Sequence, residues 1–235
     1  MNTAYNIDCM EFMRTLPDKA FDLAIVDPPY GIREDGGRNR CHFVKQKNGA
    51  SIYVKDGGYE KKSWDKHPPD PEFFCELFRV SKNQIIWGAN YFELPPAGAI
   101  FWDKVNEGSD QSDGEIAFCS LTKRVDIFRY MWRGMMQGKS ITEGATQQGD
   151  KSKNEVRIHP TQKPVALYTW LLQRYAKPGD KILDTHLGSG SSRIAAYDLG
   201  FDFVGCEIDE DYFEAQESRF LKHSAQENLF LQEEQ

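Results

Sequence analysis

At 235 residues, 40% of them apolar, the chain is long enough to bury one sizeable core, so we expect a single α/β domain over residues 1–235. It has no long apolar run, no charged-then-apolar leader and no CxxC pair, which argues against a membrane span, a secretion signal and a zinc site, and predicts a cytoplasmic protein. The net charge of −7 is contained in residues 205–235, which have nine acidic and two basic residues.

Runs of β-rich residues divide the first half of the chain. Residues 21–26 (FDLAIV) form an apolar run of strand length, and four further runs predict strands over 84–88, 98–102, 115–120 and 125–132. Between the first two runs, residues 70–82 carry apolar side chains at helical spacing behind an Asp-Pro start, which predicts a helix.

Strands and helices alternate in the last third of the chain. The patterns predict helices over 164–176, 191–200 and 210–223 and strands over 181–184 and 203–208. Because strand and helix follow each other in turn, the expected fold class is α/β, with a mostly parallel, doubly wound sheet and helices on both faces.

Two stretches, 34–66 and 134–155, fit neither pattern. Both are long for structureless connections, and loops of that length in compact domains are usually functional or disordered. They lie in the basic parts of the chain, since residues 32–67 have nine basic against five acidic residues and residues 121–163 have nine against four. Such segments can hold a phosphate backbone, although taken alone they also fit solvated loops.

The segment DPPYGI, residues 27–32, directly follows the first predicted strand. Each proline fixes φ and lacks a backbone donor, so the turn after Asp27 is stiff and leaves its carbonyl groups free to accept hydrogen bonds. This predicts a rigid acceptor site for an external donor. The plain alternative is a proline-rich turn with an incidental tyrosine.

A second motif, DTHLGSGSS at 184–192, joins a predicted strand to a helix, and the next strand ends at Glu207, 23 residues after Asp184. Glycines let such a turn approach a nucleotide closely, and the later acid accepts hydrogen bonds from ribose hydroxyls. Arg193 replaces the third glycine of a dinucleotide motif. The predicted cofactor contacts are Asp184, Gly188, Ser189, Gly190, Ser191 and Glu207.

Four motifs stand in order along the chain: DPPYGI (27–32), HPTQKP (159–164), DTHLGSGSS (184–192) and GCEID (205–209). This set resembles the β group of S-adenosylmethionine-dependent DNA amino-methyltransferases, in which the catalytic motif precedes the cofactor motif. The resemblance covers most of the chain. It implies a Rossmann-like methyltransferase fold with permuted motif order and S-adenosylmethionine as cofactor.

The resemblance also assigns residues to the cofactor. It places Asp8 near the cofactor's adenine, and His159, Thr161 and Lys163 against its methionine end. One departure is that Thr185, His186 and Leu187 replace the family's common Pro-Phe-x after the first acid.

For the reaction, the resemblance implies methyl transfer to an exocyclic amino group of a base. Asp27 would accept one N–H bond of that group and the Pro28 carbonyl the other, which turns the nitrogen lone pair toward the methyl group. Pro29 stiffens the turn. The base cannot be reached within a duplex, so it is flipped out, and Tyr30 offers a ring on which it can stack.

We expect adenine N6 as the target, because the cytosine-N4 branch more often has Ser where this chain has Asp27. Cytosine N4 is the second candidate and an RNA adenine the third. The rival class is a non-catalytic nucleic-acid-binding subunit, which would not need the complete motif set.

DNA contacts are expected from the two basic insertions, mobile in the free protein and ordered around double-stranded DNA. The expected contacts in the first insertion are Arg38, Arg40, Lys45, Lys47, Lys61 and Lys62. Because neither insertion is large enough to grip a duplex alone, a homodimer is expected. No metal site is predicted, since His159 and His186 lack clustered ligands. A restriction-modification role in a bacterium or a phage-infected cell would fit.

Overall fold

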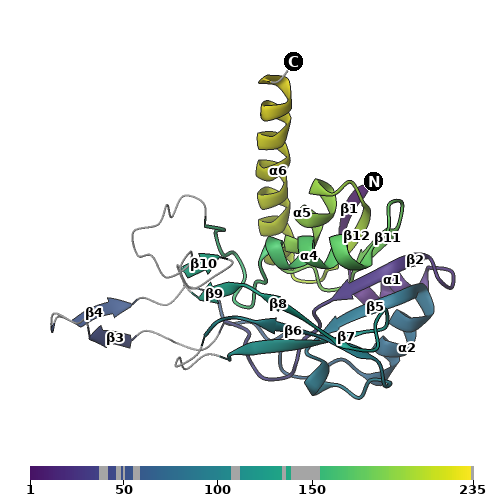
Figure 1. Cartoon of the computed structure of the whole chain (residues 1–235), viewed down its shortest axis with the longest axis horizontal. Helices are drawn as coiled ribbons and strands as arrows, with labels where there is room; N and C mark the ends of the chain where they lie inside the picture. The colour runs from purple at the N-terminus through teal and green to yellow at the C-terminus, as the bar shows by residue number, and fades with distance from the viewer. Residues whose placement is uncertain are drawn as a thin grey trace.

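An eight-stranded sheet forms the centre of the molecule (Figure 1). The computed structural model describes residues 1–36, 42–45, 49, 51–54, 59–106, 112–133, 136–138 and 154–233. In spatial order the strands are β1 (Asn2–Asn6), β12 (Asp202–Glu207), β11 (Lys181–Asp184), β2 (Phe21–Val26), β5 (Ser81–Trp87), β7 (Gly114–Cys119), β6 (Gly98–Asp103) and β8 (Val125–Arg129).

The sheet is mostly parallel, as predicted. Strand β7 runs antiparallel to β5 and β6, and the other neighbouring pairs are parallel. Strand β11, from late in the chain, pairs with β2 through Ile182 opposite Leu23. The glycine-rich turn after β11 and the DPPY turn after β2 therefore follow adjacent parallel strands, although the DPPY turn comes first in the chain.

Helices cover both faces of this sheet: α1 (Cys9–Arg14), α2 (Pro71–Val80), the 3-10 helix η1 (Ala89–Tyr91), α4 (Val165–Tyr175), α5 (Ser191–Asp198) and α6 (Glu210–Glu233). Figure 1 shows α6 extending well beyond the body of the molecule. Within the described part of the chain, no helix is both long enough and apolar enough to cross a membrane.

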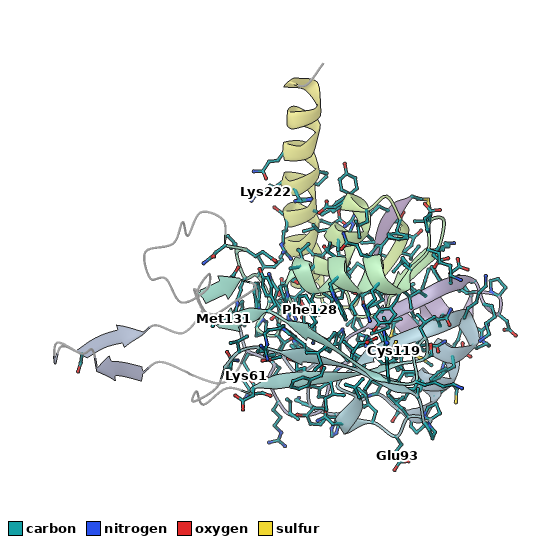
Figure 2. All side chains as sticks on the ribbon, in the orientation of Figure 1. Lys61, Glu93, Cys119, Phe128, Met131 and Lys222 are labelled. Atoms are coloured by element: carbon teal, nitrogen blue, oxygen red, sulfur yellow. The ribbon has the colours of Figure 1, made fainter. Side chains whose placement is uncertain are left out.

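Alternation along β2 explains why the fold is doubly wound. Leu23 and Ile25 belong to a core with α4 and α5, whereas Ala24 and Val26 belong to a second core with α1 and α2. Figure 2 shows side chains, among them Phe128 and Cys119, filling the first of these cores. Successive strand residues point to opposite faces, so a strand apolar at almost every position is one buried on both.

Several predicted boundaries were wrong. The single strand expected over 125–132 is two, β8 and β9 (Met131–Arg133), and β9 pairs with β10 (Met136–Gly138). Strand β8 ends before Tyr130, whose carbonyl accepts from the Trp102 indole of β6 at 3.0 Å. Helix α6 runs ten residues past the predicted end at 223, and the pattern analysis missed β1 and α1.

The stretch 34–66, expected to lack regular structure, contains a hairpin of β3 (His42–Lys45) and β4 (Ser51–Val54) that projects from the body (Figure 1). The two ends of the stretch 34–66 come together at the buried Asp65. The Asp65 carboxylate accepts from the backbone amides of Gly31 at 2.8 Å and Glu34 at 2.7 Å, and its carbonyl accepts from Arg33. The hairpin therefore leaves the body through a fixed neck beside the DPPY turn.

Candidate active site

Four predicted acids gather at one edge of the sheet, because parallel strands end on the same side. Asp27 follows β2, Asp184 ends β11, Glu207 ends β12 and Asp8 follows β1 by two residues. Gly88 follows β5 at the same edge. Ligands of open α/β sheets bind at such carboxyl edges, so this edge is the candidate active site.

Both carboxylate oxygens of Asp27 have donors. Oδ1 accepts from the Tyr30 hydroxyl at 2.6 Å, and Oδ2 accepts from the Lys163 ammonium. Lys163 is only 4% exposed and also lies 3.0 Å from Glu115 Oε2. The resemblance assigned Lys163 to the methionine end of the cofactor, and the structure shows that its ammonium also binds the carboxylate of Asp27.

Asp27, Lys163, Glu115 and Lys104 form a cluster of two carboxylates and two ammonium groups, which we call the charge cluster. Burial and the nearby Glu115 raise the pKa of Asp27 despite the Lys163 contact. Burial also acts on Glu115, but Lys163 and Lys104 outweigh it and lower its pKa to about 2. The two acids thus differ in character, with Glu115 the more strongly ionised.

Tyr30 is fixed by its neighbours. Its ring stacks on Tyr91 at a centroid distance of 4.9 Å, and Phe92 lies edge-on at 6.0 Å. Gly88, at φ +76°, leaves no room for a side chain, since a Cβ there would stand 2.2 Å from the Tyr30 ring. The structure thus positions Tyr30 as a donor to Asp27. Tyr91 already covers one face of this ring and is 45% exposed. A flipped base could stack on Tyr30 only if Tyr91 moved away, or it could stack on Tyr91 itself.

Asp184 holds the glycine-rich turn from within. It is 1% exposed, accepts from the Ser192 hydroxyl at 2.5 Å and the His186 amide at 3.0 Å, and burial raises its pKa to about 7. It was predicted to touch the cofactor, but its two contacts brace the turn. At the surface of the turn, the amide of Gly188 donates to Glu207 Oε2 at 2.7 Å.

Ser189 and Ser191, also predicted cofactor contacts, are buried against α6. Arg219 of α6 donates to the Ser189 carbonyl at 2.8 Å and to the Ser191 hydroxyl at 2.9 Å, and it pairs with Glu155 at 2.8 Å. Glu155 in turn accepts from the amide of Val165 at the start of α4. Glu155 therefore joins the start of α4 to α6, although the interval 134–155 was expected to be mobile.

Asp8 and Gly190 both shape turns. Asp8 caps α1, its carboxylate accepting from the amides of Met10 and Glu11 at 2.9 and 3.0 Å. Gly190, at φ +72°, starts α5 in a conformation that L side chains rarely adopt. Both residues border the carboxyl edge, as predicted.

A cavity of about 310 Å³ opens at this edge between α1, the chain before α2 and the turn after β11. Its lining includes Cys9, Met10, Pro29, Phe73 and His186. It therefore joins the DPPY turn to the glycine-rich turn. The charged side chains of Arg14, Asp70 and Glu72 also line it, so the cavity has both apolar and polar walls.

His159 lies over the glycine-rich turn. A Cβ on Gly188 would be 3.8 Å from its ring, and the ring packs on Tyr212 at 4.3 Å and Trp64 at 5.2 Å. Thr161 Oγ1 lies 3.1 Å from His159 Nδ1. Burial lowers the pKa of His159 to about 3, so a neutral ring covers this side of the turn.

Replacing His186 by phenylalanine should make stability less sensitive to acid. Burial lowers the pKa of His186 from 6.5 to about 4, so the unfolded chain takes up a proton first as the pH falls below 6.5, and folding loses free energy. Between pH 7.5 and 5.0 the histidine should cost about 2 kcal/mol, an upper value because its ring borders a cavity. Urea unfolding of both proteins at both pH values measures this difference, and equal losses would contradict it.

The expected DNA contacts are only partly described. Lys61 is exposed and lies at the margin from which the hairpin projects (Figure 2). Lys62 is instead paired with Asp209 at 3.2 Å and with Asp211, which offsets its charge and pins the neck to the start of α6. Residues 38, 40 and 47, and the side chain of Lys45, lie outside the described part.

Sequence reasoning missed Glu115, Lys104 and Gly88. Lys104 follows β6, and Glu115 stands at the start of β7, which is antiparallel, so its first residues share the edge where parallel strands end. No motif marks them. Among the described residues, no group of His, Cys, Asp and Glu could hold a metal ion, and the same residues hold four free cysteines.

The comparisons with known proteins agree with this geometry. A family model described as "DNA methylase", for N6 and N4 methyltransferases, matches residues 41–218. The Type II methyltransferase M2.MboI of Moraxella bovis is 24% identical over 264 residues, which cover 92% of this chain and 86% of that protein.

Solved structures share the fold. The M1.HpyAVI–SAM complex has a TM-score of 0.54 at 20% identity and covers 93% of this chain and 100% of its own. The PvuII DNA methyltransferase, described as cytosine-N4-specific, has a TM-score of 0.53 at 13% identity over 93% of this chain and 86% of its own. Since the family model spans most of the chain, this protein belongs to the N6/N4 family of DNA methyltransferases, whose cofactor is S-adenosylmethionine.

Proposed function

We propose that this protein methylates the N6 amino group of a flipped-out adenine in double-stranded DNA. The observation that carries the proposal is the carboxylate of Asp27, held at the end of β2 by the Tyr30 hydroxyl and the Lys163 ammonium. An acid at this motif position resembles the adenine branch of the family more than the cytosine branch. S-adenosylmethionine supplies the methyl group from its sulfonium.

Asp27 acts on the nitrogen of the base. Its carboxylate and the Pro28 carbonyl accept the two N–H bonds, which localises the lone pair on nitrogen and aims it at the methyl carbon. A bound S-adenosylmethionine would supply the methyl group as an electrophile and leave as the neutral thioether. The carboxylate of Asp27 would then stabilise the positive charge on the methylated nitrogen. Asp27 then takes the surplus proton, and its raised pKa fits it for holding that proton.

The residues present fit the cofactor. Glu207 is 9% exposed and already binds the amides of Gly188 and Asp209, which orients a carboxylate that can still accept from ribose hydroxyls. The cavity that begins next to Asp8 has Met10, Phe73 and His186 in its lining, side chains against which a flat base can pack. Pro29 lines the same cavity, which would bring the methyl donor next to Asp27.

Nucleoside mass spectrometry of DNA from an expressing host tests the choice of base. In a host without its own adenine-N6 and cytosine-N4 methylation, we expect N6-methyladenine and no N4-methylcytosine, and no modified base in cells that express Asp27→Ala. Mainly N4-methylcytosine would replace this proposal by the cytosine alternative. Modified bases confined to RNA would move the target to RNA.

The hairpin side of the molecule is our proposed DNA face, because its neck starts at Gly31, next to Tyr30. The exposed Lys61 supports phosphate binding there, whereas Lys62 is engaged with the start of α6. A second copy of the chain and a place in the cytoplasm of a bacterial or phage-infected cell remain predictions. A non-catalytic subunit is disfavoured, because it would not need a charged site around Asp27.

A further inference from the structure

The charge cluster presents a problem for the proposed reaction. The acceptor assigned to the amino group of the base, Asp27, is engaged by the Lys163 ammonium. A fixed positive charge at that carboxylate opposes the positive charge that develops on the reacting nitrogen. The reaction therefore gains if Lys163 has another carboxylate to bind when the base arrives.

Glu115 is placed for that purpose. Its Oε2 lies 3.0 Å from the Lys163 Nζ, so the ammonium needs little movement to bind Glu115 alone. The other oxygen of Glu115 accepts from Lys104, which stacks over the Trp102 ring at 4.8 Å and keeps the carboxylate ionised. Lys163 itself lies over the Trp87 ring at 5.5 Å, so aromatic faces line its surroundings in the core.

Resting on the proposed function, we propose that Glu115 is a positioning residue, which takes over the Lys163 ammonium from Asp27 when the amino group of the target base binds. The four charges of the cluster sum to zero, so without Glu115 the cluster would carry one surplus positive charge. That surplus positive charge would repel the positive charge that develops on the reacting nitrogen. Glu115 also lies 3.4 Å from the Tyr30 hydroxyl, so it is close to both groups that donate to Asp27, Tyr30 and Lys163.

The test compares Glu115→Gln, which keeps size and hydrogen-bonding capacity but removes the charge, with wild type, Glu115→Asp and Glu76→Gln. Glu76 pairs with Arg79 on α2, so its variant loses an ion pair of similar length far from the cluster. We expect single-turnover methyl transfer at saturating cofactor and DNA to fall about 10- to 100-fold in Glu115→Gln, as for loss of one electrostatic contact to the reacting group. Glu115→Asp should recover part of this loss, and Glu76→Gln should match wild type.

Two further readouts separate this role from a structural one. The titratable groups that act on Asp27 are Lys163, Tyr30 and Glu115, and Asp184 and Tyr168 also interact with it electrostatically. Of these, Glu115→Gln removes only a negative charge, so Asp27 should titrate at a lower pH than in wild type. Both the carboxyl ¹³C signal of Asp27 in the cofactor-free protein and the acidic limb of the rate profile should move.

The ¹³C titration needs no activity, so it judges the role of Glu115 even if wild type transfers no methyl group, a result that would overturn the proposed function alone. The proposal about Glu115 is overturned if the Asp27 titration is the same in Glu115→Gln and wild type. It is overturned equally if both proteins transfer methyl groups at the same rate, or if Glu76→Gln slows transfer as much.

Discussion

Replacing Asp27 by alanine should reduce methyl transfer at least about 10²–10³-fold while the cofactor still binds, because the lost carboxylate acts on the reacting nitrogen. The variant should fold, since Lys163 keeps Glu115 as a partner and no buried ammonium is left unpaired. Single-turnover assays give the rate and calorimetry gives the cofactor dissociation constant.

Glu207→Gln is the matched comparison, because it also removes a buried carboxylate at the same edge. It should weaken cofactor binding first, through the ribose contacts proposed for Glu207, and leave the rate at saturating cofactor closer to wild type. If Asp27→Ala kept more than a tenth of wild-type turnover, or lost the cofactor as completely as Glu207→Gln, the role given to Asp27 would be wrong.

The second large effect is expected at Gly88. The Cβ of an alanine at position 88 would stand 2.2 Å from Cε1 of Tyr30, which is closer than real Cβ atoms approach any neighbour. Gly88→Ala must therefore move the ring and with it the hydroxyl that binds Asp27. A displacement of about an ångström at a catalytic group can cost about 10²-fold in rate. We therefore expect Gly88→Ala to lose about that much activity.

Gly200→Ala is a close control. Gly200 has φ +72° against +76° at Gly88, so alanine is strained alike at both, but nothing lies within 4 Å of a Cβ at Gly200. Thermal unfolding should show a similar backbone cost in both variants, about 1 kcal/mol, with any excess in Gly88→Ala due to the clash. Equal activity in the two variants would show that the Tyr30 position does not matter.

The placement of Asp27 and Glu207 at one edge of the sheet could be predicted from the sequence, because parallel strands end at the same edge. A strand pattern followed by Asp27, and another followed by a glycine turn and Glu207, locates both residues without knowledge of the packing. The core was predictable for a similar reason, since apolar runs such as residues 21–26 identify strands buried on both faces.

The remainder depends on contacts between distant segments. Lys163 and Asp27 are 136 residues apart, and no local pattern announces their ion pair. Glu115 is the second residue of an antiparallel strand, which begins rather than ends at this edge, so a search for acids after strands does not find it. Asp184 and Ser191 stand in a cofactor motif but point into the protein, where they fix the shape of the turn.

The neck at Asp65 has a consequence for how such enzymes diversify. Because Asp65 binds Gly31 and Glu34, and the Lys62 amide donates to the Asp35 carbonyl, the hairpin joins the body through contacts that belong to the body. The chain beyond the neck can then change in length and sequence without disturbing Tyr30. A graft of another such hairpin between residues 36 and 59 should therefore leave the Tyr30 site intact and, on the DNA face proposed above, change the sequence preference.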